Sequence, residues 1–525
     1  MEDSVTLTSR ETISLDSLSE YDGPSSDLTT WDGVNDPENP QNWFARRKLW
    51  VSLVFSTMTF CYVMSSSGFS GMAPALVEEF RVSSTVGNLS GATIGSTIWG
   101  PLSECYGRRI PILLGFCGFT ACQVHVAAAS NITILLIYRT FCGFFGTAST
   151  IIAGGALADI WRLSSRGTAV IIFTICQFIA LILGPIFGAY ISYSHLHWRW
   201  AVWIPTIISA VLLLAAFCSL PETYGPRILQ QRARRFRMRT KKWAIHSQLD
   251  EQEADHSWKR YLLQPVSMLV HEIILFLIAI YLSFIYGLVF LLCEAFPFVF
   301  AHVRQWSSEN ATLSLISIGM GVALGSFLML WANHIFNQKA QQHASDLGHL
   351  AVSIHQIAED RLLPMASGGI VLSLGFFWFA ATSNLHVTWV AQDVAGIFIG
   401  CGIFIIFLQG LNYLVDVYMH KVNSAFAATN ILRSIVATVT PLIALPMFRT
   451  LGAPWASAML GFLSLILVPV PVFLHRYGKK IRTKNSVLLK MPEVTHPATR
   501  YTKTTIISPP LQSVHPSSAH HTTMI

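Results

Sequence analysis

The stretch GPLSECYGRR, residues 100–109, places one acid and two arginines directly after an apolar run. A charged side chain at the centre of a bilayer costs about 2.5–3.5 kcal/mol on insertion scales. The stretch therefore predicts a short turn at a membrane surface. It would join an apolar run that ends near residue 101 to another that begins near residue 109.

The composition around this turn is that of an integral membrane protein. Of 525 residues, 52% are hydrophobic and only 12% are charged, and the mean hydropathy is +0.49. Soluble domains carry about 25% charged residues, so this chain lacks the charge to cover a water-facing surface. Its net charge of +7 comes from basic residues in the loops between apolar runs. That placement favours orientation in a lipid bilayer over nucleic-acid binding.

Apolar runs long enough to cross the hydrocarbon layer, which takes about 20 residues, recur along the chain in two groups of six. The expected spans are 49–75, 84–101, 109–130, 133–156, 168–192, 201–220, 268–300, 312–335, 366–384, 388–416, 424–448 and 453–475. We therefore predict an all-α membrane protein with twelve transmembrane helices in two six-helix bundles. The second span is barely apolar; either it packs wholly inside a bundle or the chain has lost a segment there.

Polar segments divide the chain into five expected parts. These are a cytoplasmic N-terminal tail (1–48), a first bundle (49–221), a central cytoplasmic loop (222–264), a second bundle (265–475) and a disordered cytoplasmic tail (476–525). Basic residues concentrate in the tails, the central loop and the turn at 100–109. The excess of basic residues in cytoplasmic loops predicts that both termini lie inside the cell.

Catalytic and metal-binding patterns are missing from the sequence. The nine cysteines form no CxxC pair, and eight of them lie inside apolar runs as small hydrophobic residues would. No GxSxG, Walker loop or HExxH motif occurs. We expect neither an enzyme nor a metal or cofactor site. A membrane sensor remains the alternative from another functional class.

Several motifs together resemble the major facilitator superfamily. Gly100, Glu104, Gly107, Arg108 and Arg109 have the spacing of its signature loop, G-x-x-x-D/E-x-x-G-R-R/K. Arg139-x-x-x-Gly143-x-x-Gly146 is similar to its second motif. LGPIFGA at 183–189 is similar to its antiporter motif. WDGVNDPENPQNW at 31–43 and PETYGPRIL at 221–229 look like the fungal twelve-span drug:proton antiporter branch. The resemblance covers residues 31–485.

The resemblance implies a function as well as a fold. It implies a monomeric transporter in the lipid bilayer, whose central cavity exports hydrophobic or amphipathic small molecules (drugs, toxins or a secondary metabolite) in exchange for protons. Polyamines or other organic cations are the alternative cargo. The plasma membrane is the expected location, with the vacuolar membrane as the alternative.

The signature loop implies a latch between the inner ends of the helices. Glu104 would accept charge-assisted hydrogen bonds from Arg108 or from Arg162, and Asp159 would be the second acid. Gly100 and Gly107 would allow tight turning and close helix approach. Ordinary anchoring by positive residues would explain Arg109 and its neighbours, but not the acid or the glycines.

Four charged residues within apolar runs are candidates for proton coupling or transport. Arg139 lies about two turns from the outer end of its span and either couples protons or reaches the outer headgroups. Glu294 either takes up a proton at depth, where a carboxylate loses its solvation, or is merely wetted at the outer surface. Asp416 is expected near an inner end, where water would solvate it. Arg433 is expected to be buried and to pair with a carboxylate.

Two further features complete the expected sites. Gly184, Pro185 and Gly188 would permit a kink and close packing against a partner helix, as in an antiporter motif. Ala180 and Ala189 stand where the family prefers glycine, which predicts looser packing. The sequon at Asn310 faces outward in this topology and predicts N-glycosylation.

Overall fold

The computed structural model describes residues 28–33, 35–80, 86–250, 258–346, 359, 361–384, 386–418 and 421–485. Within these ranges every regular element is a helix, and the only strand-like pairing is an isolated bridge between Leu28 and His246. The tail predicted to be disordered began at residue 476, but residues 476–485 are helical; the rest of it, from residue 486 onward, lies outside the described residues.

The helices fall into two sets separated by the central segment. The first set is α1 (Ala45–Phe80), α2 (Val86–Cys105), α3 (Arg109–Ala127), α4 (Ile132–Ile160), α5 (Leu163–Tyr193) and α6 (His197–Ser219). The second set is α10 (Ile273–Arg304), α12 (Leu315–Asp346), α14 (Leu362–Thr382), α15 (Trp389–Val417) and α16 (Val422–Leu467). Shorter elements are η2 (Pro40–Asn42), α7 (Gly225–Thr240), α9 (Trp258–His271), α11 (Ser308–Thr312) and α17 (Pro469–Asn485).

The described helices supply the twelve predicted spans once α16 is divided. A straight helix of its 46 residues would be about twice as long as the hydrocarbon layer is thick. Gly452, with φ 76° and ψ 160°, interrupts it between the two expected spans. Ten described helical stretches are long and apolar enough to cross a membrane, the last of them containing this kink.

Helix α2 supplies the remaining span, although its composition is weakly apolar. Its 20 residues cover about 30 Å, which is enough to cross the hydrocarbon layer. It packs against α4 on one side and α16 on the other. Small and polar residues suit this position because most of the helix surface meets protein rather than lipid.

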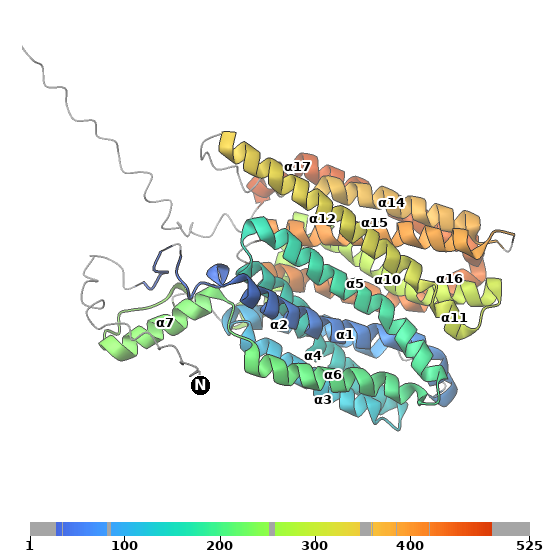
Figure 1. Cartoon of the computed structure of the whole chain (residues 1–525), viewed down its shortest axis with the longest axis horizontal. Helices are drawn as coiled ribbons and strands as arrows, with labels where there is room; N and C mark the ends of the chain where they lie inside the picture. The colour runs from blue at the N-terminus through green and yellow to red at the C-terminus, as the bar shows by residue number, and fades with distance from the viewer. Residues whose placement is uncertain are drawn as a thin grey trace, which may run out of the picture.

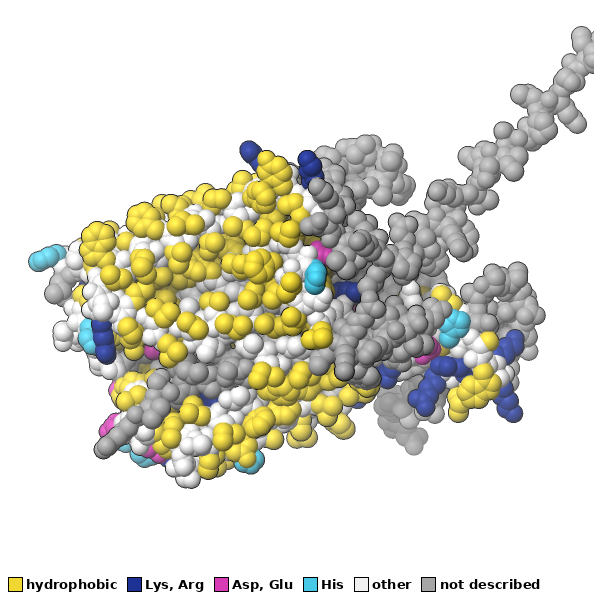
Figure 2. Space-filling view, turned by 180° about the vertical axis from the view of Figure 1, so that it is seen from behind, with side chains coloured by type: hydrophobic (Ala, Val, Ile, Leu, Met, Phe, Trp, Pro, Cys, Tyr) yellow, Lys and Arg dark blue, Asp and Glu magenta, His cyan; other side chains and the backbone are white. Residues whose placement is uncertain are grey.

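The two sets form adjacent bundles whose helices run nearly side by side (Figure 1). Within the first bundle α1 packs on α5 and α2 on α4; within the second, α10 packs on α16 and α14 on α15. The bundles meet where α2 contacts α16 and where α5 contacts α12. On the face that Figure 2 shows, hydrophobic side chains cover the length of the bundles, and most of the visible charged side chains lie toward the two ends.

A polar structure projects from one end of the bundles. It contains α7, which lies beyond the ends of the long helices (Figure 1). We call this the inner end, because its basic residues predict that it faces the cytoplasm. The segment before α1, residues 28–43, docks on α7 there through Arg232. The guanidinium of Arg232 pairs with Asp32 and Asp36, and that of Arg235 pairs with Glu38.

The Asp36 carboxylate is the centre of this docking. Burial alone would raise its pKa, but backbone N–H donors of Asp32 and Glu38 and the Arg232 side chain bring the pKa below its ordinary value. A carboxyl with a lowered pKa stabilises the folded arrangement above its unfolded pKa of about 4 and loses that contribution as pH falls through its folded value. Docking should therefore be constant from pH 7 to 5 and weaken only below about pH 4.

Arg232→Ala is expected to release the segment at neutral pH. Asp36 keeps its backbone donors but loses its cationic partner, at a cost of at least about 1.5 kcal/mol. Cleavage after Glu38 by a glutamyl endopeptidase should accelerate at least about tenfold, since accessibility follows the released population. The matched control is Arg234→Ala, whose side chain is exposed on the same helix. Equal cleavage of the two variants would contradict the docking role of Arg232.

Candidate transport site and inner latch

The carboxylate of Glu104 connects the two bundles at the inner end. Its oxygens accept hydrogen bonds from the backbone N–H of Ser424 (3.0 Å) and from the Ser424 hydroxyl (2.7 Å). Ser424 lies in the first turn of α16, where backbone N–H groups lack partners within the helix and favour a negative charge. The expected partners, Arg108 and Arg162, do not donate to it. Glu104 thus caps a helix of the opposite bundle.

A second contact runs beside it. The side-chain amide of Asn423 donates to the Ser103 hydroxyl at 2.6 Å. Gly100 allows this approach, because a Cβ there would lie 2.7 Å from the Ala427 side chain. The inner ends of α2 and α16 are therefore held closed in this conformation.

Arg108 makes its ion pair within the first bundle instead. Its Nε lies 3.0 Å from the Asp159 carboxylate, and its guanidinium also donates to Ser103. Burial opposes the charge of Arg108, but Asp159 and the stacked Tyr224 ring keep its pKa above the ordinary value. Arg108 therefore stays cationic and ties the start of α3 to the end of α4. Asp159 occupies the position expected for the second acid.

The other two arginines of the predicted latch, Arg162 and Arg109, have separate partners. Arg162 donates to the Asn42 side chain of the segment before α1 (2.6 Å). Arg109 donates through its guanidinium to the Phe217 carbonyl at the end of α6. Gly107 adopts a φ of 85°, a conformation open to few residues other than glycine. The predicted latch is thus several contacts within the first bundle plus the contact between bundles that Glu104 makes, beside the Ser103–Asn423 hydrogen bond.

Glu222 is a site residue that sequence reasoning missed. Its carboxylate accepts from the backbone N–H groups of Arg108 (2.8 Å) and Arg109 (3.2 Å), at the start of α3. It also accepts from Thr223 and Tyr224, just before α7. The signal for Glu222 in the sequence was its position directly after a predicted span, in PETYGPRIL at 221–229. Its position lets one carboxylate fix the signature loop and the start of the central segment.

Asp416 is not solvated, contrary to expectation. It is 9% exposed and forms an ion pair with Arg361, with 2.5 Å between Oδ2 and Nε. The arrangement repeats that of Arg108 with Asp159. In each bundle an arginine just before one helix pairs with the penultimate residue of the next. Asp416 therefore lies at the inner end, away from the middle of the molecule.

Arg139 is enclosed in the first bundle, so it does not reach the outer headgroups. It is 1% exposed. Its guanidinium donates to the carbonyls of Ser65 and Ser66 on α1 and stacks on Phe69, 3.4 Å from the ring centroid. No carboxylate of the described residues pairs with it, and its Nε has no partner. A buried cation without a counter-ion is expensive and, within membrane proteins, typically functional.

The antiporter motif of α5 packs against α1 at backbone distance. A Cβ at Gly188 would lie 2.2 Å from the Gly68 carbonyl oxygen, and one at Gly184 would lie 2.1 Å from the Ser67 hydroxyl. From the other side, a Cβ at Gly71 would lie 1.9 Å from the Pro185 carbonyl oxygen. The expected loosening at Ala180 and Ala189 is not seen, because both are buried: Gly71 of α1 lies against Ala189, and the Ser67 hydroxyl donates to the Ala180 carbonyl.

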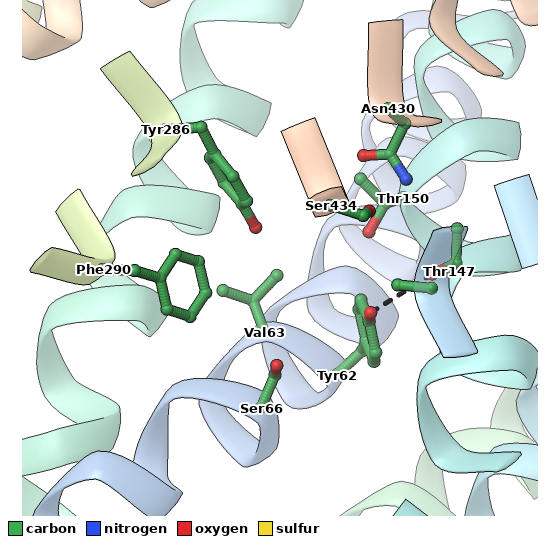
Figure 3. A pocket seen from close by; sticks show the side chains of 10 residues that line it. Tyr62, Val63, Ser66, Thr147, Thr150, Tyr286, Phe290, Asn430 and Ser434 are labelled. Carbon is green, nitrogen blue, oxygen red and sulfur yellow. Dashed lines mark hydrogen bonds between the residues drawn. The ribbon is translucent and has the colours of Figure 1, made fainter. Parts of the chain in front are cut away.

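Two small cavities lie between the bundles in the middle of the molecule. The first has a volume of about 10 Å³, and its lining includes Tyr62, Thr147, Tyr286 and Asn430. Figure 3 shows Tyr286 and Phe290 of α10 facing it on one side, and Tyr62 of α1, hydrogen-bonded to Thr147, on another. The second, of about 20 Å³, shares Thr150 and Asn430 with the first. Each has room for about one water molecule, so neither admits a larger molecule in this conformation.

Arg433 lines the second cavity. It is 4% exposed, donates to the Asn430 side chain and lies 4.8 Å and 5.1 Å from the ring centroids of Tyr286 and Phe407. Its burial agrees with expectation. The carboxylate partner expected for it is not found among the described residues, where Tyr286 and Tyr62 are the titratable groups that face it.

Glu294 lies one helical turn beyond Phe290 on α10, toward the outer end. Its side chain is half-buried, and no hydrogen bond or ion pair links it to another described residue. This position, between the cavity and the outer end, is compatible both with proton uptake at depth and with wetting at the outer surface. Arg139, Arg433 and Glu294 are thus the charged candidates near the middle, whereas Asp416 is not.

Residues 55–441 match the sequence model of the Major Facilitator Superfamily. This match covers well over half of the chain. The chain belongs to the major facilitator superfamily. It is 42% identical to the citrinin biosynthesis cluster MFS transporter mrr1 of Monascus ruber, over 87% of this chain and 91% of that protein. It is 38% identical to the ascochitine biosynthesis cluster MFS transporter of Didymella fabae, over 90% and 91% of the two chains.

Solved structures agree with the fold of this superfamily member. The proton:xylose symporter XylE bound to 6-bromo-6-deoxy-D-glucose superposes with a TM-score of 0.61 and 13% identity, over 85% of this chain and all of that one. The superfamily's transporters are multi-pass membrane proteins that move small molecules. The predicted fold and family are therefore confirmed, and this protein is a transporter.

The predicted glycosylation site lies at the opposite end of the transporter. Asn310 is exposed in α11, and its side-chain oxygen accepts from the Tyr190 hydroxyl at 3.4 Å. The sequon threonine, Thr312, is buried. Glycosylation at Asn310 remains a prediction.

Proposed function

We propose that the transporter exports a secondary metabolite or a similar amphipathic small molecule from the cell, in exchange for protons, by alternating access. The observation that carries this proposal is the closed cavity between the bundles, lined by α1, α2, α4 and α5 on one side and α10, α15 and α16 on the other. Separation of the bundles would open such a cavity to one face or the other. Relatives from biosynthetic clusters support a metabolite as cargo.

Arg139 and Glu294 are the proposed coupling residues. Glu294 is the acid of α10 nearest the cavity-lining Phe290, and nothing among the described residues neutralises its charge. Arg139 has no acid partner either, and its guanidinium lies in a protein interior that disfavours charge. Proton uptake and release at the acid would change the charge balance between these two positions as the bundles move.

The cavity favours this cargo over polyamines or other organic cations. A cation site needs carboxylates in the cavity wall, and the described lining residues include none, while Arg433 is basic. Spermidine should therefore fail to compete with an exported dye. Competition at micromolar spermidine would replace the proposed cargo class with cations.

Expression in a pump-deficient host, with a resistance screen in the presence and absence of a proton uncoupler, tests the function. Export of at least one amphipathic compound should appear and should stop with the uncoupler. Glu294→Gln removes the group proposed to take up and release the proton, and Arg139→Ala removes the buried charge that donates to the Ser65 and Ser66 carbonyls. Each variant should lower efflux at least about tenfold, which corresponds to about 1.4 kcal/mol. Fluorescent tagging should show all forms at the plasma membrane.

The matched controls are Arg239→Ala on α7 and Glu309→Gln on α11, which change the same residue types far from the cavity. Both should retain near-normal efflux. Full efflux by Arg139→Ala and Glu294→Gln would remove them as coupling residues. Efflux that persists with the uncoupler would remove proton coupling itself.

A further inference from the structure

Arg433 is a cationic residue with no carboxylate partner among the residues that the structure describes. Its side chain is 4% exposed and lies on α16 in the wall of the second cavity. One terminal nitrogen donates to Asn430, while Nε has no hydrogen-bond partner. Transfer of an unpaired cation from water to such an interior costs several kcal/mol. The position therefore needs a negative charge during some part of the transport cycle.

Arg139 differs from Arg433 in both respects that matter for binding. Two backbone carbonyls and the Phe69 ring occupy its guanidinium, and it does not line either cavity. Arg433 faces space that can open when the bundles part. Of Arg139 and Arg433, only Arg433 is placed to meet a ligand.

Resting on the export function proposed above, we infer that Arg433 binds an anionic group of the transported molecule, a carboxylate or an equally acidic phenol or enol. Nε is free, and Nη2 beside it carries a second N–H besides the one that it gives to Asn430, so these two N–H groups form the fork that a carboxylate fits. Asn430 orients the guanidinium from the same helix and is itself held by its amide donation to Ser96 on α2 (2.6 Å).

The surroundings of Arg433 specify the rest of the cargo. Tyr286 and Phe407 flank the guanidinium, and Phe426 and Phe173 line the same cavity. Aromatic faces favour planar partners through stacked or edge contacts. The Gln177 side chain in the same wall is 4% exposed and can bond a second oxygen of such a molecule. The substrate class is thus a planar aromatic molecule that carries an acid group.

Binding of 2-naphthoate and 2-naphthamide to the purified full-length protein tests this assignment. The two probes share one ring system and differ in charge at pH 7. Thermal stabilisation as a function of probe concentration gives each affinity, since a ligand that binds the folded state raises Tm by mass action. Naphthoate should bind at least about tenfold more tightly than naphthamide, the ratio expected from one charge-assisted pair.

Two variants remove the anion preference in different ways. Arg433→Gln deletes the charge and keeps a donor for Asn430. Asn430→Asp leaves the arginine in place and turns the side-chain oxygen that it already contacts into a carboxylate oxygen, which serves as its counter-ion. Both should reduce the affinity ratio to about one, and Arg433→Lys should keep part of it. The Tm of Asn430→Asp without ligand should equal or exceed that of the wild type, which separates loss of binding from loss of folding.

The assignment is overturned if naphthoate does not bind, if it binds no more tightly than naphthamide, or if both variants keep the preference. This measurement does not depend on efflux or on protons. If the anion preference is intact but no compound is exported, the proposed function is wrong and the assignment of Arg433 stands. If Arg433→Gln exports every exported acid normally, the assignment is wrong and the proposed function stands.

Discussion

Joining residues 103 and 423 is expected to stop transport. Ser103 of α2 and Asn423 of α16 lie on opposite bundles with 2.6 Å between their side-chain atoms. In a background without the nine native cysteines, a short reducible cross-linker between cysteines at these positions should hold the inner end closed. Transport should fall below about a tenth and recover after reduction, since alternating access requires the bundles to part there.

The controls for this experiment are the two single cysteine variants. Treated in the same way, each should retain its transport, because neither can bridge the bundles. Undiminished transport by the fully cross-linked double variant would show that the contact between α2 and α16 stays closed throughout the cycle. The alternating-access scheme would then need a different moving interface.

Gly71→Ala is expected to destabilise the transporter more than any other single methyl addition considered. The new Cβ would lie 1.9 Å from the Pro185 carbonyl oxygen and 2.8 Å from the Ala189 nitrogen, both backbone atoms of α5. No side-chain rotation can relieve that clash, so α1 and α5 must separate along their shared face. A loss of at least about 2 kcal/mol of stability is expected, near the upper part of the range for overpacking, together with loss of efflux.

Gly319→Ala is the matched control. It makes the same substitution in a membrane helix, but there the nearest atom to the new Cβ is in the Ile182 side chain, at an ordinary contact distance of 3.7 Å. Thermal unfolding of both variants in detergent, and their abundance in the membrane, compare them directly. Equal Tm values would show that the α1–α5 contact is looser than described.

The fold was predictable because it depends on long apolar runs, which sequence alone reveals. The paired sets of spans, the inner turn at 100–109 and the burial of Arg433 followed from hydropathy and charge placement. For Arg139 the sequence left open whether its side chain is buried or reaches the outer headgroups. The weak second span was predictable only in part, since its small residues are explained by α4 and α16, whose positions the sequence does not give.

The partners of the charged residues were harder to predict. Glu104 bonds to Ser424, 320 positions away, and no local pattern distinguishes that serine from others. The pairing of Asp416 with Arg361 required knowledge that the two bundles repeat one arrangement. Glu222 accepts hydrogen bonds from backbone N–H groups, which every residue except proline carries. The residues that donate to it therefore have no sequence signature.

The repeated ion pairs have a mechanical consequence. Arg108 with Asp159, and Arg361 with Asp416, each tie two helices of the same half, whereas the contacts across the divide are a helix cap and neutral side-chain bonds. We expect each half to move as a block and the interface between the two halves to be the part that opens. Under the proposed alternating access, these few hydrogen bonds would then set how much time the transporter spends facing each side of the membrane.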